Sequence, residues 1–70
     1  MQLSKRLKEL RARDKVTQVQ VALGSNMAER AYQRLEADHK PSFDALISLA
    51  DFFNVSLDYL VGRSDNPDRH

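Results

Sequence analysis

Arginine, glutamate and glutamine side chains crowd one short stretch of the chain, residues 29–36, which read ERAYQRLE. These residue types can hydrogen-bond to the exposed edges of nucleic-acid bases: arginine to guanine O6 and N7, and glutamate to the N4 amino group of cytosine. The same residue types also cover the solvated faces of ordinary helices. Two interpretations therefore stay open for this stretch, a surface that reads a partner and a surface that meets only water.

Catalysis and metal binding have few residues on which to draw. The chain has no cysteine, and its two histidines, His39 and His70, fall in a polar loop and in the polar end of the sequence. We find neither a glycine-rich phosphate loop nor a cluster with metal-ligand spacing. We therefore expect a protein that is not an enzyme and that uses no catalytic residue, metal or cofactor.

The length of 70 residues limits the chain to one domain of marginal stability, a few kcal/mol. Without cysteine, neither a disulfide framework nor a thiolate zinc site can supplement so small a core, and a reducing compartment suits the chain. Its apolar runs are far shorter than the ~20 residues that a membrane span needs. We expect a cytoplasmic protein with no membrane partner.

Apolar residues recur at helical spacing almost throughout, and β-strand signals are nearly absent. Leu3, Leu7 and Leu10 give a first helix a narrow apolar stripe. Thr17 stands three residues before Gln20, which is the spacing of a capping box and predicts the start of a second, short helix. We expect Gly24 to end that helix in the left-handed conformation.

Asn26 and Glu29 repeat the capping-box spacing and predict a third helix from Met27 to about Ala37. Its apolar side would hold Met27, Ala31, Tyr32 and Leu35, and residues 38–41 would form a polar loop.

Serines predict the starts of the last two helices, because Ser42 and Ser56 each precede an apolar periodic run. The fourth helix would bury Phe43, Leu46, Ile47, Ala50 and Phe53; the fifth, closed by Gly62, would turn Leu57, Leu60 and Val61 inward. These elements predict one all-α domain of five helices over residues 1–62, followed by a short polar tail, residues 63–70.

Charge is unevenly spread although the net charge is only +1. Residues 1–20 carry six Lys/Arg against two acids (+4), residues 21–40 carry three against three, and residues 41–70 carry two against five (−3). This asymmetry fits a basic surface that faces an anionic partner, and it also arises by chance in small helical proteins.

Two short helices joined by a tight break, within a small helical domain, describe a helix-turn-helix. The stretches LKELRARDKVTQVQVA, ERAYQRLE and KPSFDALISLADFFNVSLDYLVGRSDNP resemble the Cro/C1-type helix-turn-helix family, also called the XRE or lambda-repressor-like family. The resemblance covers roughly residues 3–67. It implies a compact five-helix domain whose second and third helices read DNA.

The resemblance also implies which residues touch DNA. Gln18 matches the glutamine that contacts the DNA backbone, and Lys40 lies in the loop that often touches phosphate. On the third helix, Glu29, Arg30, Gln33 and Arg34 match exposed base-reading positions. For each of these residues, solvated surface is the alternative, and Glu29 could serve only the helix cap. Tyr32 and Leu35 match core positions, and Glu36 matches a structural acid tied to an arginine of the first helix.

The chain departs from the family pattern at the turn and at the following loop. Ser25 stands where an apolar residue is usual, Asn26 where glycine is usual, and Ala28 where a Ser or Thr cap is usual. Asn26 could adopt the left-handed backbone of the turn, or it could cap a third helix that starts earlier. The loop from Glu36 to Pro41 is one residue shorter than is common, and Asp38 takes a usual glycine position.

We expect a sequence-specific regulator of transcription, a repressor that binds a double-stranded DNA operator as a homodimer through the third helix in the major groove. The alternative is an antitoxin or protein-interaction module with the same fold, whose partner is a toxin or an anti-repressor.

Overall fold

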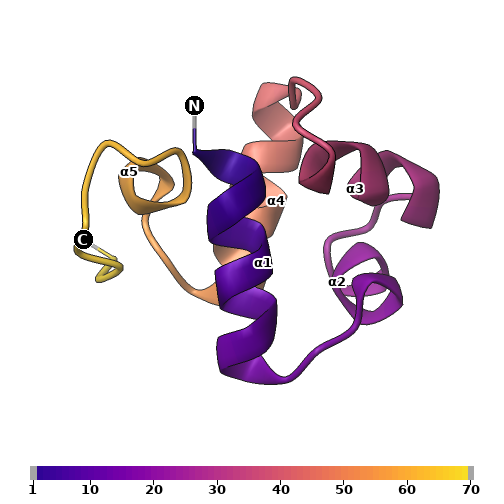
Figure 1. The fold of residues 1–70 in the computed structure, drawn as a ribbon, viewed down its shortest axis with the longest axis horizontal. Helices are drawn as coiled ribbons and strands as arrows, with labels where there is room; N and C mark the ends of the chain where they lie inside the picture. The colour runs from indigo at the N-terminus through magenta and orange to yellow at the C-terminus, as the bar shows by residue number, and fades with distance from the viewer. Residues whose placement is uncertain (1, 70) are drawn as a thin grey trace.

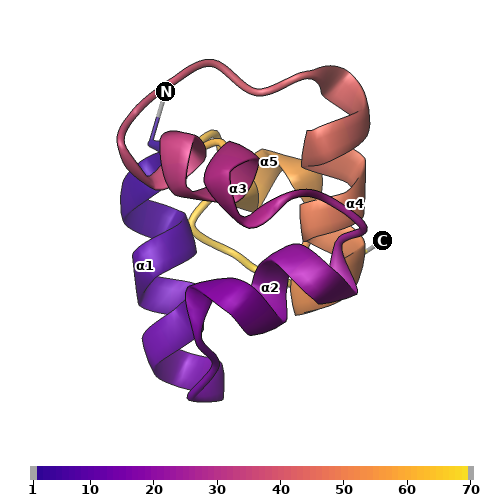
Figure 2. The same ribbon diagram turned by 90° about the vertical axis from the view of Figure 1, so that its right-hand side faces the viewer.

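Five helices and no strand make up the part of the chain described by the computed structural model, residues 2–69. The helices are α1 (Leu3–Asp14), α2 (Gln18–Gly24), α3 (Glu29–Glu36), α4 (Phe43–Phe53) and α5 (Leu57–Leu60). In Figure 1, α2 and α3 lie on one side of α1 and α5 lies on the other, while Figure 2 shows α1 and α4 at opposite sides of the molecule with α2 and α3 spanning the space between them. The predicted all-α, five-helix fold is confirmed. His70 lies outside the described residues.

Side-chain caps begin three of the helices at the predicted residues. The Thr17 hydroxyl accepts from the Gln20 N–H at 3.1 Å, and the Gln20 side chain accepts from the Thr17 N–H at 2.7 Å, so the capping box that starts α2 is complete. Ser42 and Ser56 accept in the same way from Ala45 and Tyr59. Each cap satisfies an N–H that would otherwise lack a partner at a helix start.

Each of the five helices is followed within two positions by a residue with positive φ, and the next residue donates its N–H to the carbonyl five residues earlier. The bonds Val16 to Arg11, Met27 to Ala22, His39 to Arg34, Val55 to Ala50 and Arg63 to Asp58 are 2.8–3.1 Å long. The residues with positive φ are Lys15, Asn26, Asp38, Asn54 and Gly62. This geometry satisfies carbonyls that a helix end leaves free, and asparagine, aspartate and glycine adopt it most readily.

The turn between α2 and α3 corrects two expectations from the sequence. Asn26, with φ 55°, is the left-handed residue of the turn and does not cap α3. Helix α3 therefore begins at Glu29, after an Ala28 that offers no side-chain cap. Gly24 is still helical and does not take the left-handed conformation, because Asn26 fills that role.

The core combines residues from all five helices. Leu3, Leu7 and Leu10 of α1 are buried, as are Tyr32 and Leu35 of α3, all as expected. On α4 the expectation was partly wrong: Leu49 is completely buried, whereas Phe43 and Ile47 are 68% and 37% exposed. Ala31 is also exposed, because α3 turns its Tyr32, Leu35 and Glu36 side inward. Leu60 is the buried residue of α5, and Leu57 and Val61 are half-buried.

Candidate nucleic-acid interface

Helices α2 and α3 pack against each other on the side of the molecule that faces the viewer in Figure 2. Tyr32 is fully buried and Leu35 is 6% exposed, so these two side chains hold α3 to the core. The opposite side of α3 carries only exposed residues, including Glu29, Arg30, Gln33 and Arg34. The helix therefore has two distinct sides, one that buries Tyr32, Leu35 and Glu36 and one that is exposed and mostly polar.

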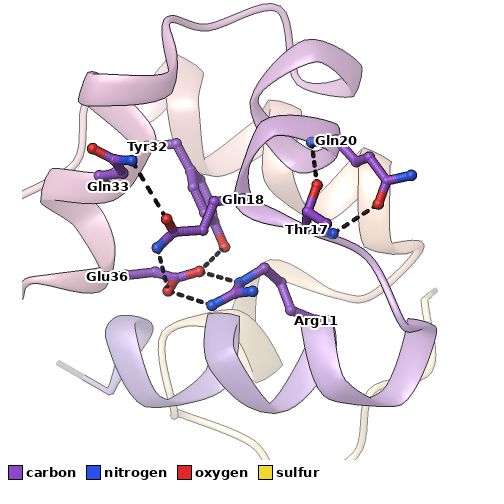
Figure 3. A network of polar contacts seen from close by, with 7 residues as sticks. All are labelled: Arg11, Thr17, Gln18, Gln20, Tyr32, Gln33 and Glu36. Atoms are coloured by element: carbon purple, nitrogen blue, oxygen red, sulfur yellow. Dashed lines mark hydrogen bonds and ion pairs between the residues drawn. The ribbon is translucent and has the colours of Figure 1, made fainter.

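A buried ion pair lies under this two-helix unit (Figure 3). Arg11 of α1 binds Glu36 of α3 through two parallel bonds, Nε to Oε2 at 2.6 Å and Nη2 to Oε1 at 2.9 Å. The Tyr32 hydroxyl donates to the same carboxylate, and the Glu36 side chain is only 5% exposed. The expected tie between Glu36 and an arginine of the first helix is confirmed.

This environment controls the protonation of both acidic groups. Burial acts to raise the pKa of Glu36, but hydrogen bonds from Arg11, Tyr32 and Gln18 outweigh it and hold the pKa below its ordinary value of 4.5. Burial raises the pKa of the Tyr32 phenol, and the neighbouring carboxylate raises it further. At neutral pH Glu36 is therefore an anion and Tyr32 is a neutral donor.

Gln18 and Gln33 connect this ion pair to the exposed surface. Gln18, the first residue of α2, donates from Nε2 to Glu36 Oε1 at 3.0 Å. Gln33 donates from Nε2 to Gln18 Oε1 at 3.4 Å and to Glu29 Oε2 at 2.9 Å. Three of the predicted contact residues thus lie in one hydrogen-bonded row. The sequence carried no signal for this row, because its members come together only when α2 packs on α3.

Arg30 and Arg34 stand four residues apart on the exposed side of α3, and neither has an ion-pair partner among residues 2–69. Arg34 also lines a hollow of about 390 Å³ together with His39, Lys40 and the start of α4. The structure thus brings Arg34 and Lys40 to one concavity. In contrast, Arg6, Arg11 and Arg13 on α1 each pair with an acid, so their charge is largely compensated.

Comparison with known proteins agrees with this geometry. A helix-turn-helix family model matches residues 7–60, which contain all of α2 and α3 and the buried Arg11–Glu36 pair. The chain belongs to the helix-turn-helix family. The Cro/C1-type resemblance seen in the sequence is thereby confirmed.

Two relatives from Bacillus subtilis carry the same kind of domain. The uncharacterized HTH-type transcriptional regulator YobD is 41% identical over 64 residues, which are 90% of this chain and 57% of YobD. The HTH-type transcriptional regulator ImmR is 38% identical over 66 residues, 93% of this chain and 52% of ImmR. The helix-turn-helix chain spans only about half the length of these relatives. No solved structure matched it.

Residues 2–69 show neither a metal-binding cluster nor a membrane-spanning helix. This part of the chain holds no group of three or more His, Cys, Asp or Glu side chains placed to hold a metal ion. Within the same range no helix combines the length and the apolar character that crossing a membrane requires.

Proposed function

We propose that this helix-turn-helix domain binds double-stranded DNA by placing α3 in the major groove, and that it regulates transcription from an operator. The observation that carries the proposal is the side of α3 that bears Arg30 and Arg34, exposed and without ion-pair partners in residues 2–69, while Tyr32 and Leu35 hold the other side in the core. Free guanidinium groups on a rigid helix are suited to bidentate bonds with guanine. The names of both relatives, as transcriptional regulators, support the same role.

The surrounding residues support a phosphate-binding role. Gln18 is the first residue of α2, and Lys40 lies beside the hollow at the start of α4; an amide and a cation at helix starts are suited to phosphate. In this proposal Arg30, Arg34, Gln33 and Glu29 read base edges, and Gln18 and Lys40 bind the DNA backbone. The role is one of binding, without catalysis or a cofactor, and belongs in the cytoplasm.

We further propose a repressor that binds as a homodimer to two half-sites. Four large apolar side chains, Val19, Leu23, Phe43 and Ile47, are 37–75% exposed, which supplies apolar surface for contact between protein molecules. Sedimentation of the chain with and without operator DNA would measure the stoichiometry. The dimer would be contradicted if a duplex with one half-site bound one chain and a duplex with two half-sites bound two chains without cooperativity.

Selection of binding sites from a random double-stranded DNA pool tests the proposed function. We expect an enriched motif whose affinity falls, and whose selectivity relaxes, in the Arg30→Ala/Arg34→Ala variant, by about 1–3 kcal/mol for each arginine that reads a base. Lys5→Ala/Lys8→Ala is the matched control, because it removes the same charge from exposed positions of α1 and should leave selectivity unchanged. Binding that is weak, unselective and indifferent to the α3 arginines would favour the antitoxin or anti-repressor alternative.

A further inference from the structure

One row of side chains runs from the buried ion pair to the exposed side of α3. We call Glu36, Gln18, Gln33 and Glu29 the amide relay, because two glutamine amides in it connect two carboxylates (Figure 3 shows all but Glu29). Its inner end is 5% exposed, and its outer members, Gln33 and Glu29, are exposed on the side of α3 that faces solvent. The relay therefore joins the core of the domain to its candidate base-reading surface.

The inner carboxylate dictates the direction of the Gln18 amide. An ionised carboxylate only accepts hydrogen bonds, so the Gln18 group that meets Glu36 must be its NH₂. Glu36 is held ionised and in place by the two bonds from Arg11 and by the Tyr32 hydroxyl. Gln18 cannot turn its amide over without setting a carbonyl oxygen against this anion. Its Oε1 must consequently point toward Gln33.

The outer carboxylate dictates the direction of the Gln33 amide in the same way. Gln33 faces two acceptors, Gln18 Oε1 at 3.4 Å and Glu29 Oε2 at 2.9 Å, and only its NH₂ group can satisfy either of them. An NH₂ group has two hydrogens, one for each acceptor, and the bond to Gln18 is the longer and weaker of the two. The one hydrogen-bonding atom of Gln33 that stays free is therefore Oε1.

We propose that Gln33 is a specificity-determining residue that reads DNA as an acceptor alone, with Gln18 as its positioning residue. Its Oε1 accepts from an exocyclic amino group in the major groove, adenine N6 or cytosine N4. An unrestrained glutamine instead binds adenine through two bonds, accepting from N6 and donating to N7. The relay removes the second bond. This inference rests on the proposed function, because it requires α3 to enter the major groove.

Modified bases test the proposal on the site that selection delivers. The base pair read by Gln33 is the one at which Gln33→Ala relaxes selectivity. Duplexes are then made that lack either the amino group at that pair (purine for adenine, or pyrimidin-2-one for cytosine) or the purine N7 (7-deaza-adenine or 7-deazaguanine). We expect removal of the amino group to weaken binding about five- to tenfold, the effect of one hydrogen bond, and removal of N7 to change it less than about twofold. Gln33→Ala on the same duplexes corrects for changes in the DNA itself.

Gln18→Met provides the second arm, because it removes the inner acceptor of Gln33 and frees one N–H. If the site contains an A·T pair at this position, the freed N–H can donate to adenine N7, so 7-deaza-adenine should now weaken binding by the Gln18→Met variant. If the site contains a G·C pair, the base preference of the variant at this position should move toward A·T. Circular dichroism and thermal unfolding verify that the variant is folded.

The outcomes separate this proposal from the one on which it rests. A loss of affinity on N7 removal with the unsubstituted chain would overturn the relay, and so would a Gln33→Ala variant that alters selectivity at no position. In both cases a motif that depends on Arg30 and Arg34 would leave the proposed function standing. No enriched motif at all would remove the proposed function and the relay together.

Discussion

At the residue scale, the Arg11–Glu36 ion pair connects three helices. It joins α1 to α3, and through Gln18 it also holds the first turn of α2. A buried ion pair is weak evidence of net stability, because desolvation offsets much of the attraction, but removal of one partner leaves the other uncompensated. The pair is therefore best understood as a device that sets how the two helices of the helix-turn-helix lie on α1.

Glu36→Gln should lower stability in a pH-dependent way. At pH 7 we expect a loss of about 3 kcal/mol, the low end for a buried pair because the Arg11 side chain is 26% exposed. The folded-state pKa of Glu36 lies below its ordinary value of 4.5, so its contribution is present above pH 4.5 and disappears as the pH falls through the folded-state pKa. Urea unfolding of both chains between pH 7 and pH 3 should show two stability curves that converge on acidification.

The pKa of Asp14 is also lowered, by its hydrogen bonds from Arg13. Asp14 is present in both the unsubstituted chain and the Glu36→Gln variant, so its effect on stability is common to the two curves. The difference between the curves therefore isolates Glu36. Curves that remain parallel down to pH 3 would show that the carboxylate is not linked to folding as argued.

Ser25 is a buried polar residue between α2 and α3. It is 4% exposed, and its hydroxyl has no hydrogen-bond partner among the described residues. A buried unpaired polar group costs about 1–3 kcal/mol, so Ser25→Ala should raise the free energy of unfolding by about 1 kcal/mol. Ser42→Ala is the opposite control, since it deletes the α4 cap and should lower stability by about 1 kcal/mol. Thermal unfolding of the three chains should rank Ser25→Ala first and Ser42→Ala last; the reverse order would refute the packing argument.

At the element scale, the helix starts could be predicted where a short-range hydrogen bond defines them. Thr17, Ser42 and Ser56 each accept from an N–H three residues later, and a spacing of three is visible in any sequence. The start of α3 was mispredicted because Asn26 suits both a cap and a left-handed turn, and the choice depends on how α3 packs on α2.

Burial could be predicted less well than helix position, and the candidate site only in part. Helix α4 has apolar residues around most of its circumference, so its spacing did not reveal that Leu49 is buried while Phe43 is exposed. At the site, the resemblance pointed to Gln18 and Gln33 separately. Their mutual hydrogen bond, across 15 residues of sequence, is a product of packing that no local pattern encodes.

Gly24 tests the contact between α2 and α4. It is a helical residue, and a Cβ added to it would lie 2.2 Å from Cε1 of the Phe52 ring. That ring packs edge-on against the ring of Phe53, with 4.9 Å between the two ring centroids. Glycine to alanine within a helix ordinarily stabilises by about 0.5–1 kcal/mol. Here we expect Gly24→Ala to destabilise instead, by about 1–3 kcal/mol, because the ring must move out of a packed position.

The Phe52→Ala background supplies the control for this prediction. Without the ring, the alanine at position 24 should regain its ordinary stabilising effect, so the two substitutions should be strongly non-additive in thermal or urea unfolding. Additive effects would mean that α2 and α4 do not meet as closely as the contact indicates.

At the scale of the whole molecule, one ion pair, Arg6–Asp65, joins the basic first part of the chain to its acidic last part. Arg6 of the basic α1 lies over the Tyr59 ring at 4.2 Å and binds Asp65 at 2.9 Å, and Arg69 binds Asp51 at 2.8 Å. The Ser56 N–H also donates to the Pro67 carbonyl at 3.2 Å. The acidic end of the chain thus folds back on α1, α4 and α5, whereas Arg30, Arg34 and Lys40 stay without an ion-pair partner in residues 2–69.

This arrangement bears on where the cooperative domain ends, which the sequence predicts to be at residue 62. If residues 63–69 act as part of the folded unit, Asp65→Asn should lower the melting temperature, because Arg6 would stay over Tyr59 but lose its carboxylate partner. In a domain of this size the melting temperature falls by about 4–8 °C for each kcal/mol of stability lost. Asp68→Asn is the matched control: it makes the same charge change three residues away, at a carboxylate with no ion-pair partner in residues 2–69. High salt should reduce the difference between the two variants, since Asp65 is fully exposed. Equal melting temperatures would instead support a domain that is complete at residue 62, with a tail that rests on its surface without stabilising it.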